Sequence, residues 1–348
     1  MKFLKLMLFV FSANCFAQST PSEMAEMSLQ ELFFEDIYEE GVTSPWTLAS
    51  QFKSVEFKGY LDGTKSLSND EVLWSGPMSG EPRTGKNFPV VPTVITQNAA
   101  IFALGYKFSN QWQGSLLVPY IHQETDHISI IPDYNNFNID SSGVGDITVV
   151  ALYNWLTTNK GVWGFSFGVS LPLGSIDEVG DTPREAGDQQ LPYTMQLGSG
   201  TYDFPFALNY QYSGAHDINV GLTAKIRIGT NDRNYRLGNK YGLNGRYAYD
   251  LSPKLQAFVL LDFEYSKSIH GQDDDLLLPA LPDNPYPASI TNPDLFGGKK
   301  VNLGLGLLWR VVNDFRLTVE IGAPLYQNLN GPQPKENWQT TINISSAL

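Results

Sequence analysis

Hydrophobic and polar residues alternate one by one along most of the chain, which is the pattern of β-strands that have two different faces. In residues 202–212 the bulky apolar side chains, from Tyr202 to Tyr212, fall on one face, while Asp203, Asn209 and Gln211 fall on the other. Strands of globular proteins have about five or six residues, whereas membrane strands need about 9–11. The length of this segment therefore favours strands that cross a membrane over a soluble β-sandwich.

The same alternation predicts about twelve strands, separated in turn by short and long connections. Strands are expected at residues 46–61, 94–108, 112–121, 144–156, 163–173, 202–212, 218–228, 241–250, 255–265, 301–309, 315–321 and 337–346. Short turns are expected at 109–111, 157–161, 213–217, 251–254 and 312–314. Long connections are expected at 62–93, 122–143, 174–201, 229–240, 266–300 and 322–336.

Outer-membrane barrels combine short periplasmic turns with long external loops and an even number of strands. The sequence therefore predicts an all-β fold, a transmembrane antiparallel up-and-down β-barrel over residues 46–348, with both of its ends in the periplasm. Aromatic residues support this fold, because Trp112, Trp155 and Trp163 lie near short turns while Tyr202 and Tyr265 lie near long loops. Amphipathic rings prefer the two headgroup levels of a membrane.

The first 45 residues differ from the barrel pattern. Two lysines, an apolar run at residues 6–11 and a small residue at Ala17 predict a signal peptide over residues 1–17, cleaved after Ala17. The segment 18–45 contains a capping-box pattern from Ser28 to Glu31. It is expected to form a periplasmic leader or a small plug helix inside the barrel. An exported barrel of this kind belongs in the outer membrane of a Gram-negative-type cell.

Composition excludes several classes of function. The 348 residues carry 23 Lys and Arg against 36 Asp and Glu, a formal net charge of −13, which argues against a nucleic-acid partner. The single cysteine, Cys15, would leave with the signal peptide, so we expect no disulfide framework and no thiol chemistry. No spacing of histidines or other ligands indicates a zinc site, and no cofactor is predicted.

Catalysis has little support in the sequence. The nearest approach to a serine–histidine pair is His127-Ile128-Ser129, in a segment without a visible third partner, so a barrel lipase or esterase is the least favoured reading. The acidic run Asp273–Asp275 has two open interpretations, a site for divalent cations that bridge lipopolysaccharide or an ordinary solvated loop. We expect the protein not to be an enzyme.

Charged residues on the polar face of the strands should point into the barrel, because an Arg or Lys that faces lipid at the midplane costs about 2–4 kcal/mol. The candidate lumen-lining residues are Lys107, Asp146, Asp203, Lys225, Arg227, Arg246, Asp262, Glu264, Arg310, Arg316 and Glu320. A hairpin centred on residue 215 places Asp203 opposite Arg227. Neighbouring strands should then carry a basic wall of Lys225, Arg227 and Arg246 beside an acidic patch of Asp262 and Glu264.

Two interpretations of these charges remain open. They could create a transverse field across a water-filled pore, or they could pair with one another and fill a narrow barrel.

Three segments carry a resemblance to a known family. They are Gly143-Val144-Gly145-Asp146, the stretch from Leu197 to Asp203, and Pro324-Leu325-Tyr326-Gln327 followed by Asn330-Gly331. In this order and at these strand starts, the chain resembles a family of outer-membrane barrels linked to a MetA pathway of phenol degradation, over about residues 94–345. The resemblance implies a barrel that takes up small, aromatic or hydrophobic compounds, and it transfers no site residues to this chain.

The leading functional hypothesis is an outer-membrane channel or transporter for a small solute. The alternative is a structural or surface-interaction barrel with a closed lumen, and the third is the esterase. The expected partners are outer-membrane lipid, lipopolysaccharide and a small-molecule solute, and the barrel is expected to be a monomer.

Overall fold

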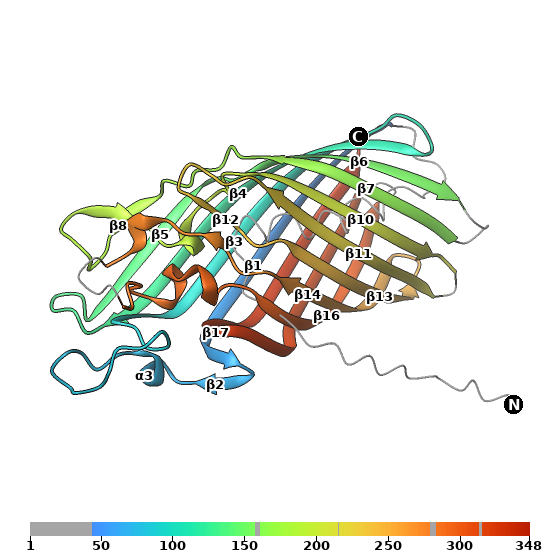
Figure 1. Cartoon of the computed structure of the whole chain (residues 1–348). Coiled ribbons are helices and arrows are strands. Elements are labelled where there is room, and N and C mark those ends of the chain that lie inside the picture. Colours follow the sequence, from blue (N-terminus) through green and yellow to red (C-terminus); the bar gives the residue numbers. More distant parts are fainter. Residues whose placement is uncertain (1–43, 157–160, 215, 279–282, 313–314) are drawn as a thin grey trace, which may run out of the picture.

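The computed structural model describes residues 44–156, 161–214, 216–278, 283–312 and 315–348. They form a closed antiparallel β-barrel, so the predicted all-β fold is confirmed (Figure 1). The signal peptide and most of the predicted leader lie outside the described residues. Eleven strands make up the ring, which are β1 (Trp46–Gly63), β3 (Val90–Lys107), β4 (Trp112–Ser129), β6 (Ile147–Leu156), β7 (Gly161–Leu171), β10 (Tyr202–Tyr212), β11 (Asp217–Ile228), β13 (Lys240–Ser252), β14 (Leu255–Ser266), β16 (Gly298–Val312) and β17 (Phe315–Ala347).

The barrel closes through β17, which pairs with β16 on one side and with β1 on the other. Its residues up to Leu329 pair with β16, and its residues from Leu329 onward pair with β1. The side chain of Gln327 forms two hydrogen bonds of 2.9 Å with the backbone of Glu336. The strand therefore folds back on itself, and its two halves lie side by side. The sequence predicted two strands here and a loop over 322–336. That loop was wrong, because most of its residues pair with β16 or β1 despite register shifts near the Gly and Pro residues.

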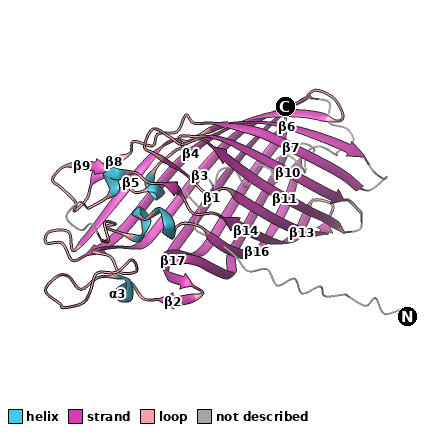
Figure 2. Ribbon diagram, viewed as in Figure 1, coloured by secondary structure: helices cyan, strands magenta, loops and turns pink. Residues whose placement is uncertain are grey.

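The remaining elements lie at the end of the barrel that carries the long loops, opposite the chain's C-terminus (Figures 1 and 2). The extra strands are β2 (Lys65–Leu67), β5 (Asn136–Val144), β8 (Val179–Asp181), β9 (Asp188–Gln190), β12 (Tyr235–Arg236) and β15 (His270–Gly271). The helical turns are α3 (Asn69–Val72), η1 (Tyr193–Met195), η2 (Asp274–Leu276), η3 (Ser289–Thr291) and η4 (Pro293–Leu295). No helix among the described residues is long and apolar enough to span a membrane.

The strand β4 shows where the membrane-facing zone ends. Its outward side chains are the exposed Trp112, Leu116 and Tyr120, and beyond them the exposed Glu124 and Asp126. The strand has 18 residues, more than the 9–11 or so that a membrane crossing needs, so it continues past the lipid. The sequence predicted a loop over 122–143. That prediction was wrong, because β4 and β5 pair there with polar residues on both faces, which gives no alternation of hydrophobicity.

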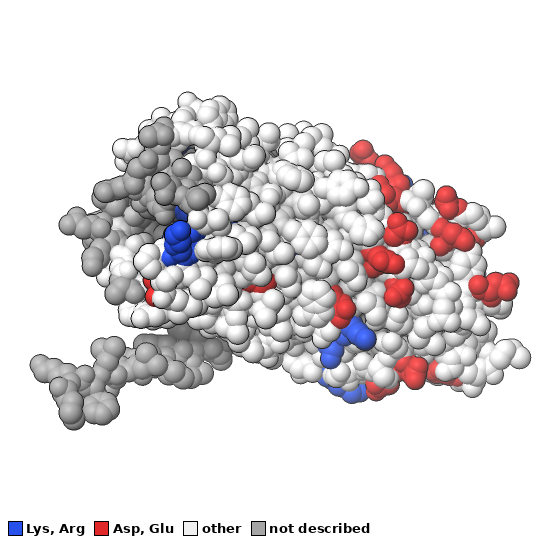
Figure 3. Space-filling view, turned by 180° about the vertical axis from the view of Figure 1, so that it is seen from behind, with Lys and Arg blue, Asp and Glu red and all other residues white. Residues whose placement is uncertain are grey.

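The outer surface of the barrel is apolar between two aromatic zones. Trp155, Trp163 and Tyr210 stack in a row near the short turns, with ring centroids 6.2 Å and 5.0 Å apart. Tyr241 and Tyr265 stack at the opposite ends of their strands. Figure 3 shows a broad belt almost free of charged residues, with acidic side chains gathered towards the long-loop end. This distribution is typical of a barrel that is embedded in a bilayer.

Two segments of the long loops fold into the barrel, and together we call them the plug. Residues 190–199 and 287–293 are buried without interruption. Ile290 packs against inward residues of β1 and β3, including Val55 and Ile95, while Met195 packs against Ile139 of β5. The two segments meet through η1 and η3. A plug from internal loops was not predicted, because short apolar stretches such as these occur in any loop.

Asp146 anchors the plug at the point where β5 gives way to β6. Its carboxylate accepts the backbone N–H of Gly174 at 2.9 Å and that of Ser199 at 2.8 Å. The loop can approach this closely because Gly198 has no side chain: a Cβ there would overlap the carbonyl oxygen of Gly174 and lie 2.7 Å from a carboxylate oxygen of Asp146. The resemblance segments around residues 143–146 and 197–203 therefore meet in space.

Gly198→Ala is expected to loosen the plug, since the added methyl group forces the two loop ends apart at a cost of about 1–3 kcal/mol. Trypsin should then cut faster after Arg184, the only basic residue in 172–201, when the refolded barrel is digested in detergent. The matched control is Gly245→Ala in β13, whose Cβ would meet nothing within 4 Å. Equal cleavage rates for both variants and the wild type would contradict the anchoring role.

Candidate functional site

The inner face of the barrel carries the candidate site, because its alternate positions face away from the apolar exterior. The predicted lumen-lining residues fall into three groups by exposure. Asp146, Asp203, Lys225, Arg227, Glu264, Arg316 and Glu320 are buried. Arg246, Asp262 and Arg310 are half-buried, and Lys107 is exposed at the last residue of β3.

The predicted pairing of Asp203 with Arg227 is confirmed. The two residues are direct partners in the β10–β11 ladder, and Nε of Arg227 lies 2.9 Å from Oδ2 of Asp203. Both side chains are at most 1% exposed. The guanidinium also donates to the carbonyl of Gly238, and Thr201 donates to the carboxylate at 2.7 Å. This pair therefore ties the barrel wall to the loop after β11.

A second set of charges, which we call the ion chain, runs across the next strands. Lys240 lies 3.2 Å from Glu264, and Lys300 lies 3.9 Å from Glu264 and 2.6 Å from Glu336. All four side chains are less than 8% exposed. The sequence missed Lys240, Lys300 and Glu336 because each lay in a predicted loop, although β13, β16 and β17 include them.

The predicted basic wall and acidic patch are wrong. In the β11–β13 ladder Lys225 pairs with Lys240, whereas Arg246 pairs with Asn219. Arg246 is therefore six residues along β13 from the position opposite Lys225. The guanidinium of Arg246 stacks over the ring of Phe258 at 4.1 Å. Glu264 is neutralised by its lysines and forms no acidic patch with Asp262. Opposite charges are mixed along the wall, with pairs such as Arg227 with Asp203 and Lys240 with Glu264 across neighbouring strands.

A row of amide side chains lies next to the ion chain on the inner face. Successive ladder partners across seven neighbouring strands are Asn154, Gly164, Asn209, Gly221, Asn244, Asp262 and Asn302. A Cβ at Gly221 would overlap the carboxamide of Asn209 and lie 2.6 Å from that of Asn244, so the glycine makes room for both. We call this set the amide row. The sequence could have indicated only its hairpin partners, such as Asn209 with Gly221, because long loops leave the other registers undetermined.

One ion pair on the inner face near the short turns is accessible to solvent. Arg310 pairs with Asp250 at 3.2 Å, and these side chains are 31% and 51% exposed. Gln256 bridges the carboxylates of Asp217 and Asp250 at 2.8 and 3.1 Å. Paired charges therefore fill the long-loop half, while near the short turns solvent reaches the Arg310–Asp250 pair although Arg316 beside it is buried.

Uncharged polar groups lie where the plug meets the wall. Gln97 and Gln123 are ladder partners on β3 and β4, and both are fully buried, as is Thr194 of η1. Gln123 donates to Ser141 at 2.9 Å and to the carbonyl of Gln196 at 3.4 Å. The carboxamide of Gln97 and the hydroxyl of Thr194 have no hydrogen-bond partner within the described part of the chain. Buried polar atoms of this kind are costly and mark a place where another polar molecule gains hydrogen bonds.

The candidate catalytic residues, His127 and Ser129, contact other groups and do not form a catalytic pair. His127 stacks on Phe137 with ring centroids 4.6 Å apart, and its Nδ1 contacts the carbonyl of Thr125 at 3.1 Å. The hydroxyl of Ser129 accepts the N–H of Ile131 at 3.0 Å. Both side chains are built into the wall at the long-loop end, so they offer no exposed nucleophile.

The acidic run after β15 ties loops together. Arg233 lies 3.3 Å from Asp273, 3.0 Å from Asp275 and 2.7 Å from Asp177. Burial raises the pKa of the Asp273 carboxyl, although the Arg233 guanidinium works in the opposite direction. In the described ranges no cluster of three or more histidine, cysteine or acidic residues is arranged to hold a metal ion. The Asp273–Asp275 run is therefore a loop contact in this structure.

Lys300→Met is expected to destabilise the barrel by about 3–5 kcal/mol, because it leaves Glu264 and Glu336 buried with one cation fewer. Unfolding of the refolded protein in detergent by guanidinium chloride, followed by tryptophan fluorescence, measures this change. Lys299→Met, one residue away with an outward side chain, is the control and should change the unfolding free energy by less than about 1 kcal/mol. A Lys300→Met variant as stable as the control would exclude an energetic role for the ion chain.

Solved structures of outer-membrane barrels share this architecture. An outer membrane channel from Pseudomonas putida F1 has 14% sequence identity and a TM-score of 0.56, over 89% of this chain and 98% of that one. The translocator domain of the autotransporter NalP from Neisseria meningitidis has 7% identity and a TM-score of 0.46, over 94% and 96% of the two chains. A FadL homologue from Pseudomonas aeruginosa has 10% identity and a TM-score of 0.41, over 96% and 100%. The first likeness supports the barrel fold.

A comparison with curated protein sequences gives no match. A family model described as "Putative MetA-pathway of phenol degradation" matches residues 79–326. This match covers well over half of the chain and includes the first two segments that carry the resemblance seen in the sequence, together with the start of the third. The chain therefore belongs to this family.

Proposed function

We propose that the protein is an outer-membrane channel for a small solute. The observation that carries the proposal is the amide row, in which four asparagines and Asp262 lie on the inner face of five of the seven strands while the exterior of the barrel is apolar. Amides that only filled space would be a poor choice at these positions, because buried amides gain stability only when each is hydrogen-bonded. A polar row of this kind suits water and a hydrogen-bonding solute.

The proposed topology places the long loops outside the cell and both barrel ends in the periplasm. The two halves of β17 would each cross the membrane, which gives twelve crossing segments, an even number as in other bacterial barrels. Cleavage of the signal peptide after Ala17 would leave the leader 18–45 on the periplasmic side. The barrel would work as a monomer, since its ladder is already closed within one chain.

The plug defines the gate in this proposal. A solute that enters from the long-loop end must pass residues 190–199 and 287–293, and the uncharged polar groups there include Gln97, Gln123 and Thr194. Apolar side chains such as Ile290 and Met195 lie beside them. Neutral amides and hydroxyls next to apolar groups favour a small, largely hydrophobic solute with a hydroxyl group over an ion. The family's link to phenol degradation is consistent with an aromatic solute.

The competing function is a surface-interaction barrel with a closed lumen. The nearly complete burial of the ion chain and of the plug favours it. The two functions differ in what happens when the plug is released, because only a channel has a continuous path behind it.

Asp146→Ala should release the plug and raise the planar-bilayer conductance several-fold over the wild type, since Gly174 and Ser199 lose their shared acceptor. The control Asp140→Ala removes an exposed acidic residue of the adjacent β5 and should leave conductance unchanged. Heat-dependent mobility on gels verifies that each variant is folded. If the folded Asp146→Ala protein shows no conductance, the closed-lumen function is the correct one.

Thr194→Val is expected to slow the entry of phenol into barrel-containing liposomes by about 2- to 10-fold, the effect of losing one hydrogen bond to the solute. Phenol uptake is followed by its absorbance after rapid filtration. The control Thr341→Val changes a buried threonine of β17 outside the plug and should not alter the rate. Identical phenol rates for both variants would exclude Thr194 from the solute path.

A further inference from the structure

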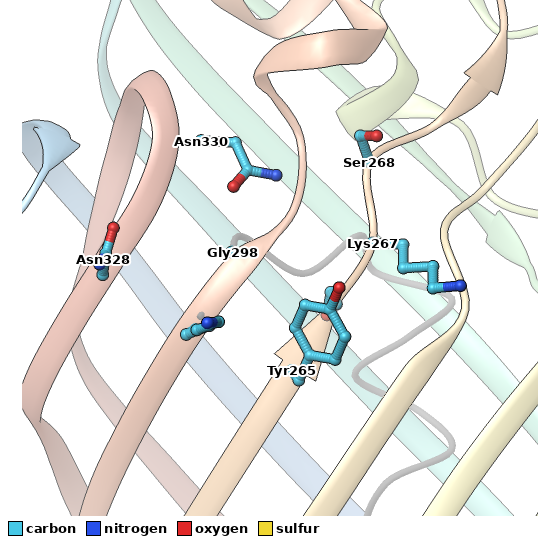
Figure 4. A pocket seen from close by; sticks show the side chains of 8 residues that line it. Tyr265, Lys267, Ser268, Gly298, Asn328 and Asn330 are labelled. Carbon is cyan, nitrogen blue, oxygen red and sulfur yellow. The ribbon is translucent and has the colours of Figure 1, made fainter. Parts of the chain in front are cut away.

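A pocket of about 440 Å³ opens at the long-loop end between β14, β16 and β17, apart from the plug. Its lining residues are Tyr265, Ser266, Lys267, Ser268, Gly298, Lys299, Asn328 and Asn330. Figure 4 shows the asparagines on one side of the Gly298 backbone and Tyr265, Lys267 and Ser268 on the other. The volume falls within the range of about 300–1,000 Å³ that is typical of ligand pockets.

The pocket belongs to the outer surface of the barrel. Tyr265, Lys299 and Asn328 are neighbours in one row across the three strands. They alternate along their strands with buried residues such as Glu264 and Lys300, so their side chains point away from the lumen. A ligand held here would lie on the membrane-facing side and would not interfere with a solute inside the barrel.

Aromatic residues locate the pocket relative to the membrane. Tyr265 stacks on Tyr241 with ring centroids 5.9 Å apart, and both rings lie where the strands end at the long loops. Tyrosine at such positions lies at the level of the lipid headgroups. Lys267 follows two residues later on the loop side, so the pocket opens where outer-leaflet headgroups meet water.

The chemistry of the pocket favours an anion. Its lining contains two ammonium groups, two carboxamides and the hydroxyl groups of Tyr265 and Ser268, and no carboxylate, while the Ser266 hydroxyl bonds to Glu264 on the inner side. Within the described residues, neither Lys267 nor Lys299 pairs with an acidic side chain, although the chain carries 13 more acidic than basic residues. The neighbouring inward lysines, Lys240 and Lys300, are both neutralised by glutamates. Two uncompensated cations at the headgroup level of an acidic protein attract phosphate.

We propose that this pocket binds the phosphorylated headgroup of an outer-leaflet glycolipid. Lys267 and Lys299 would contact a phosphate on a sugar, while Asn328, Asn330 and Ser268 would hydrogen-bond the sugar and its phosphate oxygens. Lysine is suited to this task because its ammonium acts as a compact point charge with three donors. The assignment does not depend on whether the lumen conducts.

The test is native mass spectrometry of the full refolded chain in detergent, titrated with diphosphorylated lipid A. The double variant Lys267→Gln/Lys299→Gln should bind lipid A about 30-fold more weakly, since each lysine near a membrane surface contributes a factor of about five. The matched control Lys65→Gln/Lys86→Gln removes two exposed loop lysines and the same total charge, and should bind lipid A like the wild type. Gel mobility and single-channel conductance, expected to be unchanged in both, verify the folded state.

Two further probes identify the source of the phosphate. Lipid A without phosphates should bind the wild type as weakly as the double variant binds intact lipid A. Inorganic phosphate at millimolar concentration should not displace lipid A, because the lipid adds sugar and surface contacts. Equal loss of binding in both double variants, equal binding of the phosphate-free lipid, or displacement by inorganic phosphate would each overturn the proposal.

Discussion

The closed ladder of backbone hydrogen bonds is the constraint on which the rest of this structure depends. Inside a bilayer no water satisfies an open strand edge, so a sheet can cross only if its first and last strands pair. Here β17 pairs with both β16 and β1. Closure then fixes the inner wall, because the register of each strand pair decides which side chains become neighbours. The ion chain and the amide row both follow from that register.

The sequence predicted those features of the fold that follow from alternation between an apolar and a polar face. It predicted the barrel, most of its short turns and the Asp203–Arg227 pair, since a hairpin with a short turn has little freedom of register. It failed where both faces are polar, as at residues 122–129, and where Gly and Pro interrupt a strand, as at residues 322–336. The second failure removed Glu336 from the predicted site, and predicted strands that began one residue too late, at 241 and 301, removed its partners Lys240 and Lys300.

The sequence did not predict the plug for a different reason. Its position depends on contacts between residues far apart in the chain, such as Ile290 with Val55 and Asp146 with Ser199. No local pattern marks these contacts, because a loop that folds inward uses the same Gly, Ser and Pro residues as a loop that stays in solvent. Similarly, the wrong basic wall came from assigning Arg246 to the level of Arg227 without knowing the β11–β13 register.

The place of Glu336 in the ion chain has a consequence for how the barrel assembles. Lys300 belongs to β16, but its closest carboxylate comes from the half of β17 that pairs with β1. The side chain and backbone bonds between Gln327 and Glu336 hold that half beside the first half of β17, so the ion pair forms when β17 folds back on itself. Until then Lys300 lacks its closest counter-charge in a low-dielectric surrounding, which favours folding of this last hairpin before it pairs with β1.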